Sequence, residues 1–145
     1  MAEDILEWRE RLLQALNSAL PEFLAGRARA AHIGSQGLTL YMRKSFRLWQ
    51  GGAIPCLDVG SIELQPTLRG AGVGKRIFDR IEAVARESKR CVYVENVLNP
   101  VLERLLVKRG IYVPYTHGGR AVTEGGLSYL GLTAHPADCL TGVSP

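Results

Sequence analysis

Residues 69–75, Arg69-Gly70-Ala71-Gly72-Val73-Gly74-Lys75, decide the fold of this chain. They lie between a predicted strand over 54–64 and a predicted amphipathic helix over 72–88. Glycines allow consecutive backbone N–H groups to converge on an anion without Cβ clashes, and the start of a helix adds unpaired N–H donors and the positive end of its dipole. The stretch therefore predicts a phosphate-binding loop, with a pyrophosphate as its natural ligand.

Two familiar glycine-rich loops do not fit this stretch. A P-loop needs Ser or Thr after its lysine and a glycine five positions before the last one, but Lys75 is followed by Arg76 and no glycine stands at position 69. A dinucleotide-binding loop needs Gly-x-Gly-x-x-Gly, whereas the glycines here alternate. The pattern that remains is Arg-x-x-Gly-x-Gly, which residues 69–74 satisfy.

This pattern, preceded by Ile62-Glu63-Leu64-Gln65-Pro66, resembles the acyl-CoA-binding motif of the GNAT superfamily of N-acetyltransferases. The resemblance covers residues 54–116 and includes the order strand, Gln-Pro turn, glycine loop, helix, strand, Asn-Pro, helix, Lys-Arg-Gly and strand. It implies an α/β fold, in which a single GNAT-like domain over 1–145 has a mixed β-sheet flanked by helices. Residues 1–53 are then a divergent N-terminal part, 54–116 the acyl-CoA-binding core and 134–145 a loose tail.

Composition agrees with one globular domain. The chain has 145 residues, of which 46% are hydrophobic and 22% charged, which is enough to bury a core without metal or disulfide support. No apolar run approaches the roughly 20 residues that span a bilayer, and the start is acidic, so we expect a cytoplasmic protein. Cys56, Cys91 and Cys139 are far apart and predict reduced thiols, with no metal site.

The net charge of +4 is concentrated in residues 69–90. That segment holds seven basic and three acidic residues: Arg69, Lys75, Arg76, Arg80, Arg86, Lys89 and Arg90 against Asp79, Glu82 and Glu87. A nucleic-acid groove is one explanation, but Phe78 is its only aromatic residue for base stacking. The phosphates of a nucleotide explain Arg69, Lys75 and Arg76 better, while a solvated helix face explains Arg80 and Arg86.

The remaining elements follow from hydrophobic periodicity. We expect a helix over 5–24 that Pro21 ends or kinks, an Ala/Arg-rich link, strands or a hairpin over 38–49, a strand over 91–97, a helix from Asn99-Pro100 to Gly110, and strands over 111–116 and 127–132. In the helix over 72–88, one apolar stripe should face the core and polar residues should face outward. The stripe is Val73, Ile77, Ile81 and Val84, and the outward residues are Lys75, Asp79, Glu82 and Arg86.

The resemblance also implies a cofactor site for acetyl-CoA as acyl donor. It assigns the pyrophosphate to Arg69, Gly70, Ala71, Gly72, Val73, Gly74 and Lys75, and the pantetheine arm to Ile62, Glu63 and Leu64. Asn99 matches a family asparagine that bonds the amide arm, although a helix N-cap explains it equally well. The loop has an alternative explanation too, as a tight turn between strand and helix.

Catalysis needs a base for the ammonium proton and an acid for the leaving thiolate. Glu63 is the preferred base, with Asp58, Glu95 and His117 as competitors; strict alternation places Glu63 opposite Ile62 and Leu64, so its direction depends on a bulge. The family's usual acid is a tyrosine four residues before the glycine that ends the helix, and Leu106 occupies that position here. Either Tyr112 or Tyr115 serves instead, or the thiolate leaves with solvent help, or the chain binds CoA without efficient turnover.

The sequence thus predicts an acetyl-CoA-dependent N-acetyltransferase that modifies a primary amine, on a protein lysine, a protein N-terminus or a small molecule, by direct attack. The N-terminal helix, residues 38–52 and the loop over 118–126 should shape the acceptor side. One alternative is a non-catalytic GNAT-like protein that binds CoA or a partner protein, and a homodimer fits either activity. The third interpretation is a basic nucleic-acid-binding module.

Overall fold

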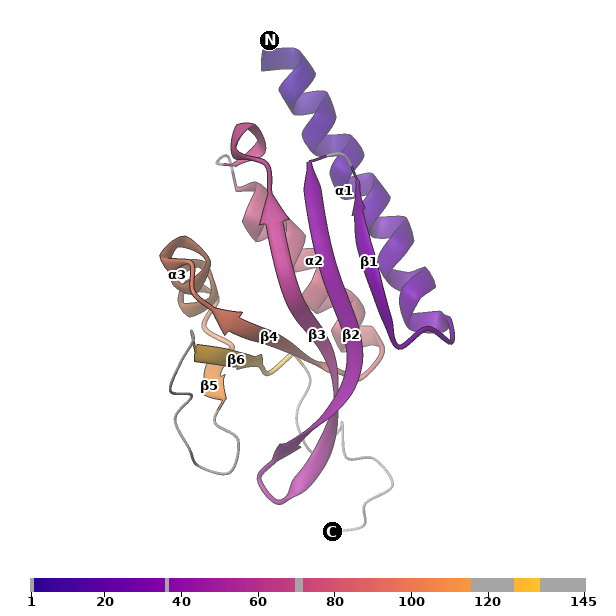
Figure 1. The fold of residues 1–145 in the computed structure, drawn as a ribbon, viewed down its shortest axis with the longest axis vertical. Helices are drawn as coiled ribbons and strands as arrows, with labels where there is room; N and C mark the ends of the chain where they lie inside the picture. Colours follow the sequence, from indigo (N-terminus) through magenta and orange to yellow (C-terminus); the bar gives the residue numbers. More distant parts are fainter. Residues whose placement is uncertain (1, 36, 70–71, 116–126, 134–145) are drawn as a thin grey trace.

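The computed structural model describes residues 2–35, 37–69, 72–115 and 127–133, which form three helices, a short 3-10 helix and six strands (Figure 1). Gly70, Ala71, the loop that includes His117, and the tail over 134–145 lie outside the described residues. The elements in chain order are α1 (Ala2–Ala25), β1 (Ala30–Ser35), β2 (Leu38–Trp49), β3 (Gly52–Leu64), η1 (Pro66–Leu68), α2 (Val73–Glu87), β4 (Cys91–Val97), α3 (Pro100–Arg109), β5 (Tyr112–Tyr115) and β6 (Leu127–Gly131).

The six strands form one sheet in the order β1-β2-β3-β4-β6-β5. Only the central pair, β3 and β4, is parallel, and its crossover is made by α2; the other neighbours are antiparallel. A parallel pair needs a long crossover connection, which the helix after the glycine loop supplies. The predicted α/β fold with a mixed sheet flanked by helices is confirmed.

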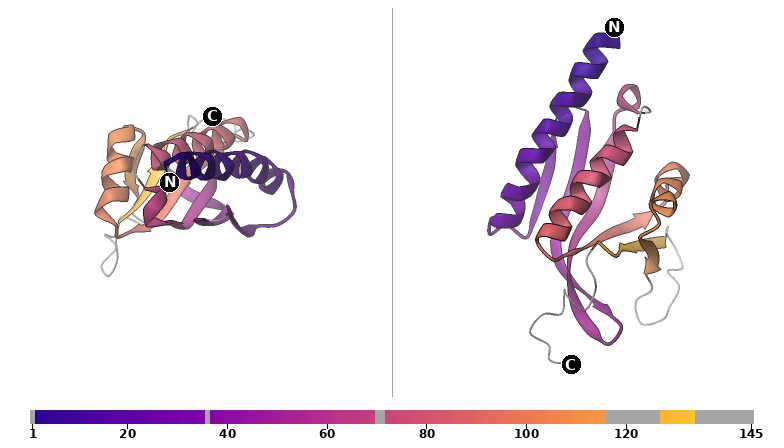
Figure 2. Two further views of the ribbon diagram at one scale, coloured as in Figure 1. Left: turned by 90° about the horizontal axis from the view of Figure 1, so that it is seen from above. Right: turned by 180° about the vertical axis from the view of Figure 1, so that it is seen from behind.

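Helices α1 and α2 lie side by side on one face of the sheet (Figure 2). Between them and the sheet is the main core, to which α2 contributes the predicted stripe of Val73, Ile77 and Ile81 and α3 contributes Leu106, each at most 1% exposed. Burying such side chains stabilises the fold by about 1.5–3 kcal/mol each relative to exposing them. The core therefore fixes the start of α2, and with it the glycine loop, against the end of β3.

The opposite face of the sheet has a smaller apolar cluster, with no residue from the described helices. It consists of Ile54, Cys56, Cys91, Tyr93, Tyr115 and Leu130. Cys56 and Cys91 are buried there. We call this side the helix-free face.

Two features of the N-terminal part differ from the predictions. Helix α1 continues to Ala25, so Pro21 does not end it; buried Leu20 and Phe23 on either side of the proline hold the last turn against the core. The Ala/Arg-rich link contains strand β1, which the sequence analysis missed because Ala30–Ser35 has little hydrophobic alternation. Pairing with β2, from Ala30 opposite Arg43 to Ser35 opposite Leu38, makes it a strand.

Residues 38–49 form one long strand, and their hairpin partner is β3. The turn contains Gln50 and Gly51, both with positive φ (49° and 83°), and Trp49 pairs with Gly52. Two consecutive residues with positive φ match the right-handed twist of a β-hairpin. The expected hairpin therefore joins β2 to β3 through this turn.

Glu82 was predicted to face solvent, and this prediction is wrong. Its carboxylate is buried and accepts hydrogen bonds from Arg109 Nε and Arg109 Nη2, both at 2.6 Å, and from Tyr112 Oη at 2.8 Å. A buried carboxylate is tolerated when it is fully paired in this way. Sequence periodicity could not show this burial, because the two partners of Glu82 lie 27 and 30 residues later in the chain.

Candidate functional site

The parallel strands β3 and β4 separate at the centre of the sheet. They pair from Cys56 opposite Cys91 to Val59 opposite Val94, after which β3 pairs only with β2 while β4 turns toward α3 (Figure 1). Each strand is irregular at this level: Gly60 of β3 has no partner on β2, and Asn96 of β4 has a φ of +53°. These irregularities open a gap between the two strands.

The bulge at Gly60 decides which way the following side chains point. A Cβ at Gly60 would lie 2.7 Å from Tyr41 Cδ2, so glycine is required there. Before the bulge Leu57 and Val59 face the helices, and after it Ile62 and Leu64 do so. Because side chains alternate along a strand, Glu63 points to the helix-free face. The bulge on which the direction of Glu63 depended is therefore present.

An apolar groove of about 190 Å³ lies where β3 leaves β4. Its walls are the end of β3, the first turns of α2 and the buried side of α3, and it is lined by Ile62, Leu64, Arg69, Gly74, Ile77, Phe78, Asn99, Val101, Leu102 and Leu105. Gly74 also lines it, and a Cβ there would be in ordinary contact with Leu105 Cδ2, at 3.4 Å. A narrow apolar groove of this kind fits an uncharged, extended chain.

A larger polar groove, about 690 Å³, continues from the apolar one. Its lining is Gly37, Thr39, Ile62, Glu63, Leu64, Gln65, Pro66, Arg69 and Asn99, so Ile62, Leu64, Arg69 and Asn99 line both grooves. Thr39 and Gln65 were not among the predicted site residues. The alternation of Leu38, Thr39 and Leu40 could have placed Thr39 opposite the core, but not beside Glu63, its partner across the strands.

The structure describes the two arms of the glycine loop, Arg69 on one side and residues 72–75 on the other. These arms lie at one end of the grooves. Arg69 donates from Nε to the carbonyl oxygen of Leu64 at 2.9 Å, and Gly72 caps α2 with a φ of +75°. Lys75 is exposed in the first turn of α2, where free backbone N–H groups and the helix dipole favour an anion. Arg76, which the sequence assigned to phosphate, is instead paired with Glu10 of α1.

Asn99 is the N-cap of α3, as predicted. Its Oδ1 accepts a hydrogen bond from the backbone N–H of Val101 at 2.8 Å. The side-chain amide has two N–H donors that the cap does not use, and the residue lines both grooves. The cap role and a ligand-binding role are therefore compatible.

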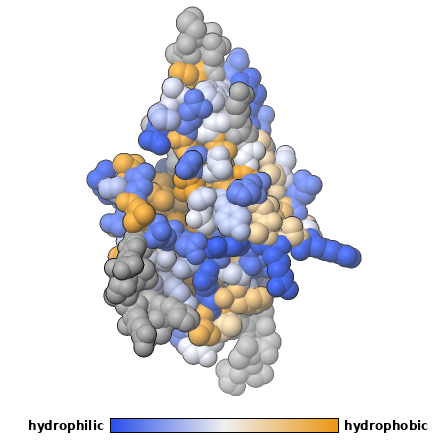
Figure 3. Space-filling model, viewed as in Figure 1, coloured by the Kyte–Doolittle hydropathy of each residue, from blue (hydrophilic) through white to orange (hydrophobic). Residues whose placement is uncertain are grey.

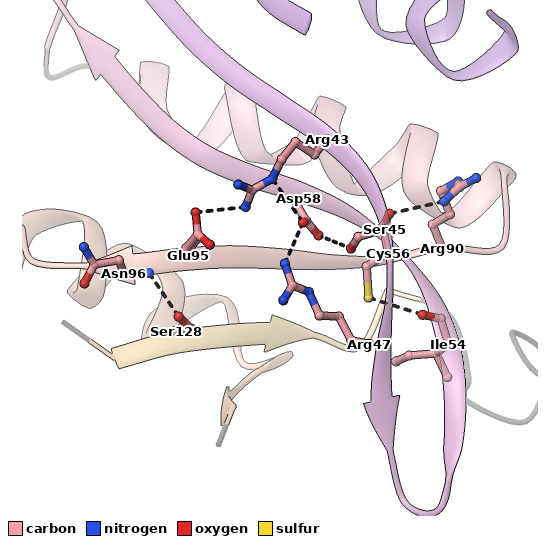
Figure 4. Close-up of polar contacts among 10 residues, drawn as sticks. All are labelled: Arg43, Ser45, Arg47, Ile54, Cys56, Asp58, Arg90, Glu95, Asn96 and Ser128. Carbon is pink, nitrogen blue, oxygen red and sulfur yellow. Dashed lines mark hydrogen bonds and ion pairs between the residues drawn. The ribbon is translucent and has the colours of Figure 1, made fainter. Parts of the chain in front are cut away.

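The three carboxylates considered as bases have different surroundings, and Figure 4 shows two of them, Asp58 and Glu95. Asp58 is completely buried and accepts from Ser45 Oγ and Arg47 Nη2, both at 2.7 Å, with Arg43 Nε at 3.4 Å. Glu95 is half-exposed and accepts from Arg43 Nη2 at 2.8 Å. Asp58 therefore balances the two arginines and is closed to a substrate.

Arg43 links Asp58 and Glu95. Burial lowers the pKa of Arg43, but the hydrogen bond and charge of Glu95 and the charge of Asp58 outweigh it, so the pKa is raised overall. Arg47 lies over the ring of Tyr93, 3.8 Å from its centroid. In contrast, Glu63 is exposed and makes no side-chain hydrogen bond or ion pair within the described part of the chain, so its carboxylate is open to a ligand in the polar groove.

Neither tyrosine proposed as acid lines a groove. Tyr112 donates to Glu82, and burial, together with the charge of Glu82, raises its pKa well above the usual value. Tyr115 donates to the carbonyl oxygen of Leu48 at 2.9 Å and packs edge-on against Tyr93. Leu106 is buried in the core. The structure thus does not bring a tyrosine hydroxyl of the described residues to the grooves, because these rings complete the packing around β5.

Across the described ranges, no group of three or more His, Cys, Asp or Glu side chains could hold a metal ion. Within the same ranges, no helix is both long and apolar enough to cross a bilayer.

The sequence matches no protein-family model and no curated protein. Among solved structures, a mutant of the toxin AtaT, bound to the C-terminus of the antitoxin AtaR and acetyl-CoA, has a TM-score of 0.50 at 16% identity, over 65% of this chain and 57% of the toxin chain. The KacTA–DNA complex gives a TM-score of 0.48 at 14% identity, over 65% and 57% of the two chains. The match thus spans a little more than half of the toxin's length.

At this identity, the likeness to AtaT concerns the fold alone. This chain, with its mixed sheet, shares the fold of that toxin.

Proposed function

We propose that this protein is an acetyl-CoA-dependent N-acetyltransferase that transfers an acetyl group to a primary amine. The observation that carries the proposal is the gap between β3 and β4, where an apolar groove ends at a glycine loop on the start of a helix. A thioester cofactor has the matching parts, a thin uncharged arm and a pyrophosphate. The solved structure with TM-score 0.50 contains acetyl-CoA, which supports the same donor here.

The donor's contacts divide between side chains and backbone. Ile62 and Leu64 would pack against the pantetheine arm, and Asn99 would donate its side-chain amide to the arm. The loop over 69–75 would hold the pyrophosphate through backbone N–H groups, with Arg69 and Lys75 adding positive charge. These contacts bind and orient the thioester at the point where the strands separate.

The acceptor would approach from the helix-free face. Ile62 and Leu64 of β3 line both grooves, whereas Glu63 between them lines the polar groove alone, so donor and acceptor would meet across a single strand. The amine nitrogen attacks the thioester carbonyl carbon, the C–S bond breaks, and the products are an amide and CoA. Glu63 takes the ammonium proton, and solvent protonates the leaving thiolate, since the described tyrosines are outside the grooves.

Calorimetric titration with acetyl-CoA, CoA and ATP tests the donor site before an acceptor is known. We expect micromolar binding of acetyl-CoA, well above that of ATP. Once an amine is found, in a screen of lysine peptides, free N-termini and small amines, Glu63→Gln should slow transfer without weakening acetyl-CoA binding. Equal affinity for ATP would contradict the acyl-CoA assignment.

A second candidate is a non-catalytic protein that binds CoA. Buried Leu106 at the family's tyrosine position favours it, as do the engaged hydroxyls of Tyr112 and Tyr115. Such a protein would bind acetyl-CoA and CoA but form no acetylated product in a single-turnover assay with the same amine panel. A protein partner would then use the helix-free face.

A further inference from the structure

Three consecutive residues of α1 lie against both arms of the glycine loop. Arg9 donates from Nη2 to the carbonyl oxygen of Arg69, just before the loop, at 3.3 Å. Glu10 accepts two hydrogen bonds from Arg76, just after the loop, with Nη1–Oε1 at 2.8 Å and Nη2–Oε2 at 3.3 Å. The N-terminal helix, which carries no part of the family motif, therefore contacts the loop from two sides.

Trp8 completes this contact through packing. Its indole lies beside the turn at Gly37, where an added Cβ would be 2.8 Å from Cζ2, and that turn also abuts Leu68 of η1, which is fully buried. The carbonyl oxygen of Gly37 accepts the backbone N–H of Gln65 at 2.8 Å. The chain from the end of β3 to Arg69 is thus held between α1 and the β1–β2 turn.

The pairing of Arg76 changes the role that its position suggests. A two-point contact with a carboxylate fixes both the position and the plane of a guanidinium. The hydrogen bond from Arg76 lowers the pKa of Glu10, and the same bond raises the pKa of Arg76, so both groups stay charged over the physiological range. Arg76 therefore acts as a link between α2 and α1.

We propose that Arg9 and Glu10 are positioning residues for the donor's pyrophosphate, which they control by fixing the two arms of the loop. The proposal rests on the proposed function, because the ligand is acetyl-CoA. Neither residue needs to touch the ligand. Without Glu10, the start of α2 loses its tie to α1, and the loop must be ordered at the expense of binding affinity.

The direction in which Glu10→Gln changes the affinity for acetyl-CoA separates a positioning role from a purely electrostatic one. Glu10→Gln removes a negative charge near an anionic ligand and frees Arg76, so a phosphate-binding Arg76 predicts equal or tighter binding of acetyl-CoA. Positioning predicts weaker binding, by about threefold for an exposed ion pair. Glu7→Gln is the control, because Glu7 is exposed on the same helix and forms no ion pair with a described residue. Calorimetry on the full chain measures all three proteins.

Hydrogen exchange gives a second reading that does not require a variant. Acetyl-CoA should slow amide exchange in the first three turns of α1 in the wild-type chain, although these turns lie outside both grooves. Unchanged exchange there, or a Glu10→Gln variant that binds as tightly as wild type, would overturn the positioning role. If the wild-type chain does not bind acetyl-CoA at all, it is the proposed function that fails.

Discussion

The apolar groove and the ionic clusters of this protein are lined by opposite kinds of side chain. The groove is lined largely by apolar side chains from the end of β3, the start of α2 and α3. The ionic clusters pair buried carboxylates with guanidinium or phenol groups: Asp58 with Arg43 and Arg47, and Glu82 with Arg109 and Tyr112. The molecular surface coloured by hydropathy shows apolar residues near the groove and a band of hydrophilic residues below them (Figure 3).

The groove should matter for ligand binding, whereas the ionic clusters should matter for the stability of the fold. An open apolar groove can lose its ligand without loss of fold. A buried carboxylate that balances two guanidinium groups cannot be removed without leaving charge uncompensated in the protein. Substitutions in the two kinds of region should therefore affect different measurements.

The largest effect should come from Asp58→Ala. It leaves Arg43 and Arg47 without their shared carboxylate, and breaking a buried ion pair in this way costs about 3–5 kcal/mol. Urea denaturation would measure the free energy of unfolding. Glu87→Gln, on the exposed side of α2, is the control and should change it by less than about 0.5 kcal/mol. If Asp58→Ala lowers the free energy of unfolding by less than about 1 kcal/mol, Asp58 stabilises the fold no more than an ordinary surface ion pair does.

Tyr112→Phe should lower the free energy of unfolding by about 1.5–3 kcal/mol, because buried Glu82 loses one hydrogen bond. Tyr112 has a pKa above the usual 10.0, so the unfolded chain releases the phenolic proton first. Its contribution is complete below about pH 10 and is lost as the pH rises further.

Urea denaturation from pH 8 to 11 would show this dependence, with a steep alkaline loss in the wild type and a shallower one in Tyr112→Phe. Tyr41→Phe, whose ring stacks with His32 on the helix-free face, is the control and should keep the steep loss. If Tyr112→Phe follows the wild-type profile, the alkaline loss arises elsewhere.

Gly72→Trp should weaken acetyl-CoA binding at least about tenfold, or about 1.4 kcal/mol, by filling the loop. Gly110→Trp is a close control, since the two glycines have φ values of +75° and +76° and open space at Cβ. Both variants carry similar backbone strain, so both should lose similar stability. Calorimetry should distinguish them, and an equal loss of affinity would mean that the effect comes from strain and not from the site.

The smallest effect on stability should come from Glu63→Gln. An exposed carboxylate without a partner in the described residues should leave the free energy of unfolding within about 0.5 kcal/mol of wild type. Its effect belongs to transfer, where we expect slower turnover. A stability loss comparable to that of Asp58→Ala would contradict the division between binding and ionic regions.

Much of the fold could be predicted from local sequence. Strand β4 and helix α3 have the predicted bounds, and α2 follows its apolar stripe, because each has a hydrophobic period that matches its geometry and clear end signals such as Asn99 and Gly110. The loop and the residues of β3 beside it were predicted as a unit, and the structure places Ile62, Leu64, Arg69 and Asn99 together around the grooves.

Other features depended on contacts between distant residues. Strand β1 exists because β2 pairs with it, and Glu82 is buried because Arg109 and Tyr112 reach it from later elements. The two tyrosines were proposed as acids from chemistry alone, and core packing directs their hydroxyls away from the grooves.

The sequence by itself predicted the glycine loop and the helix that follows it, because glycine spacing and a helix start act over a few adjacent residues. Only the tertiary structure decided the direction of Glu63, since the bulge at Gly60 appears in the pairing of β3 with β2. It also decided that α1 holds the loop, through Arg9 and Glu10, about 60 residues away. Local geometry is encoded in neighbouring residues, whereas the alignment of a site depends on packing that joins distant segments.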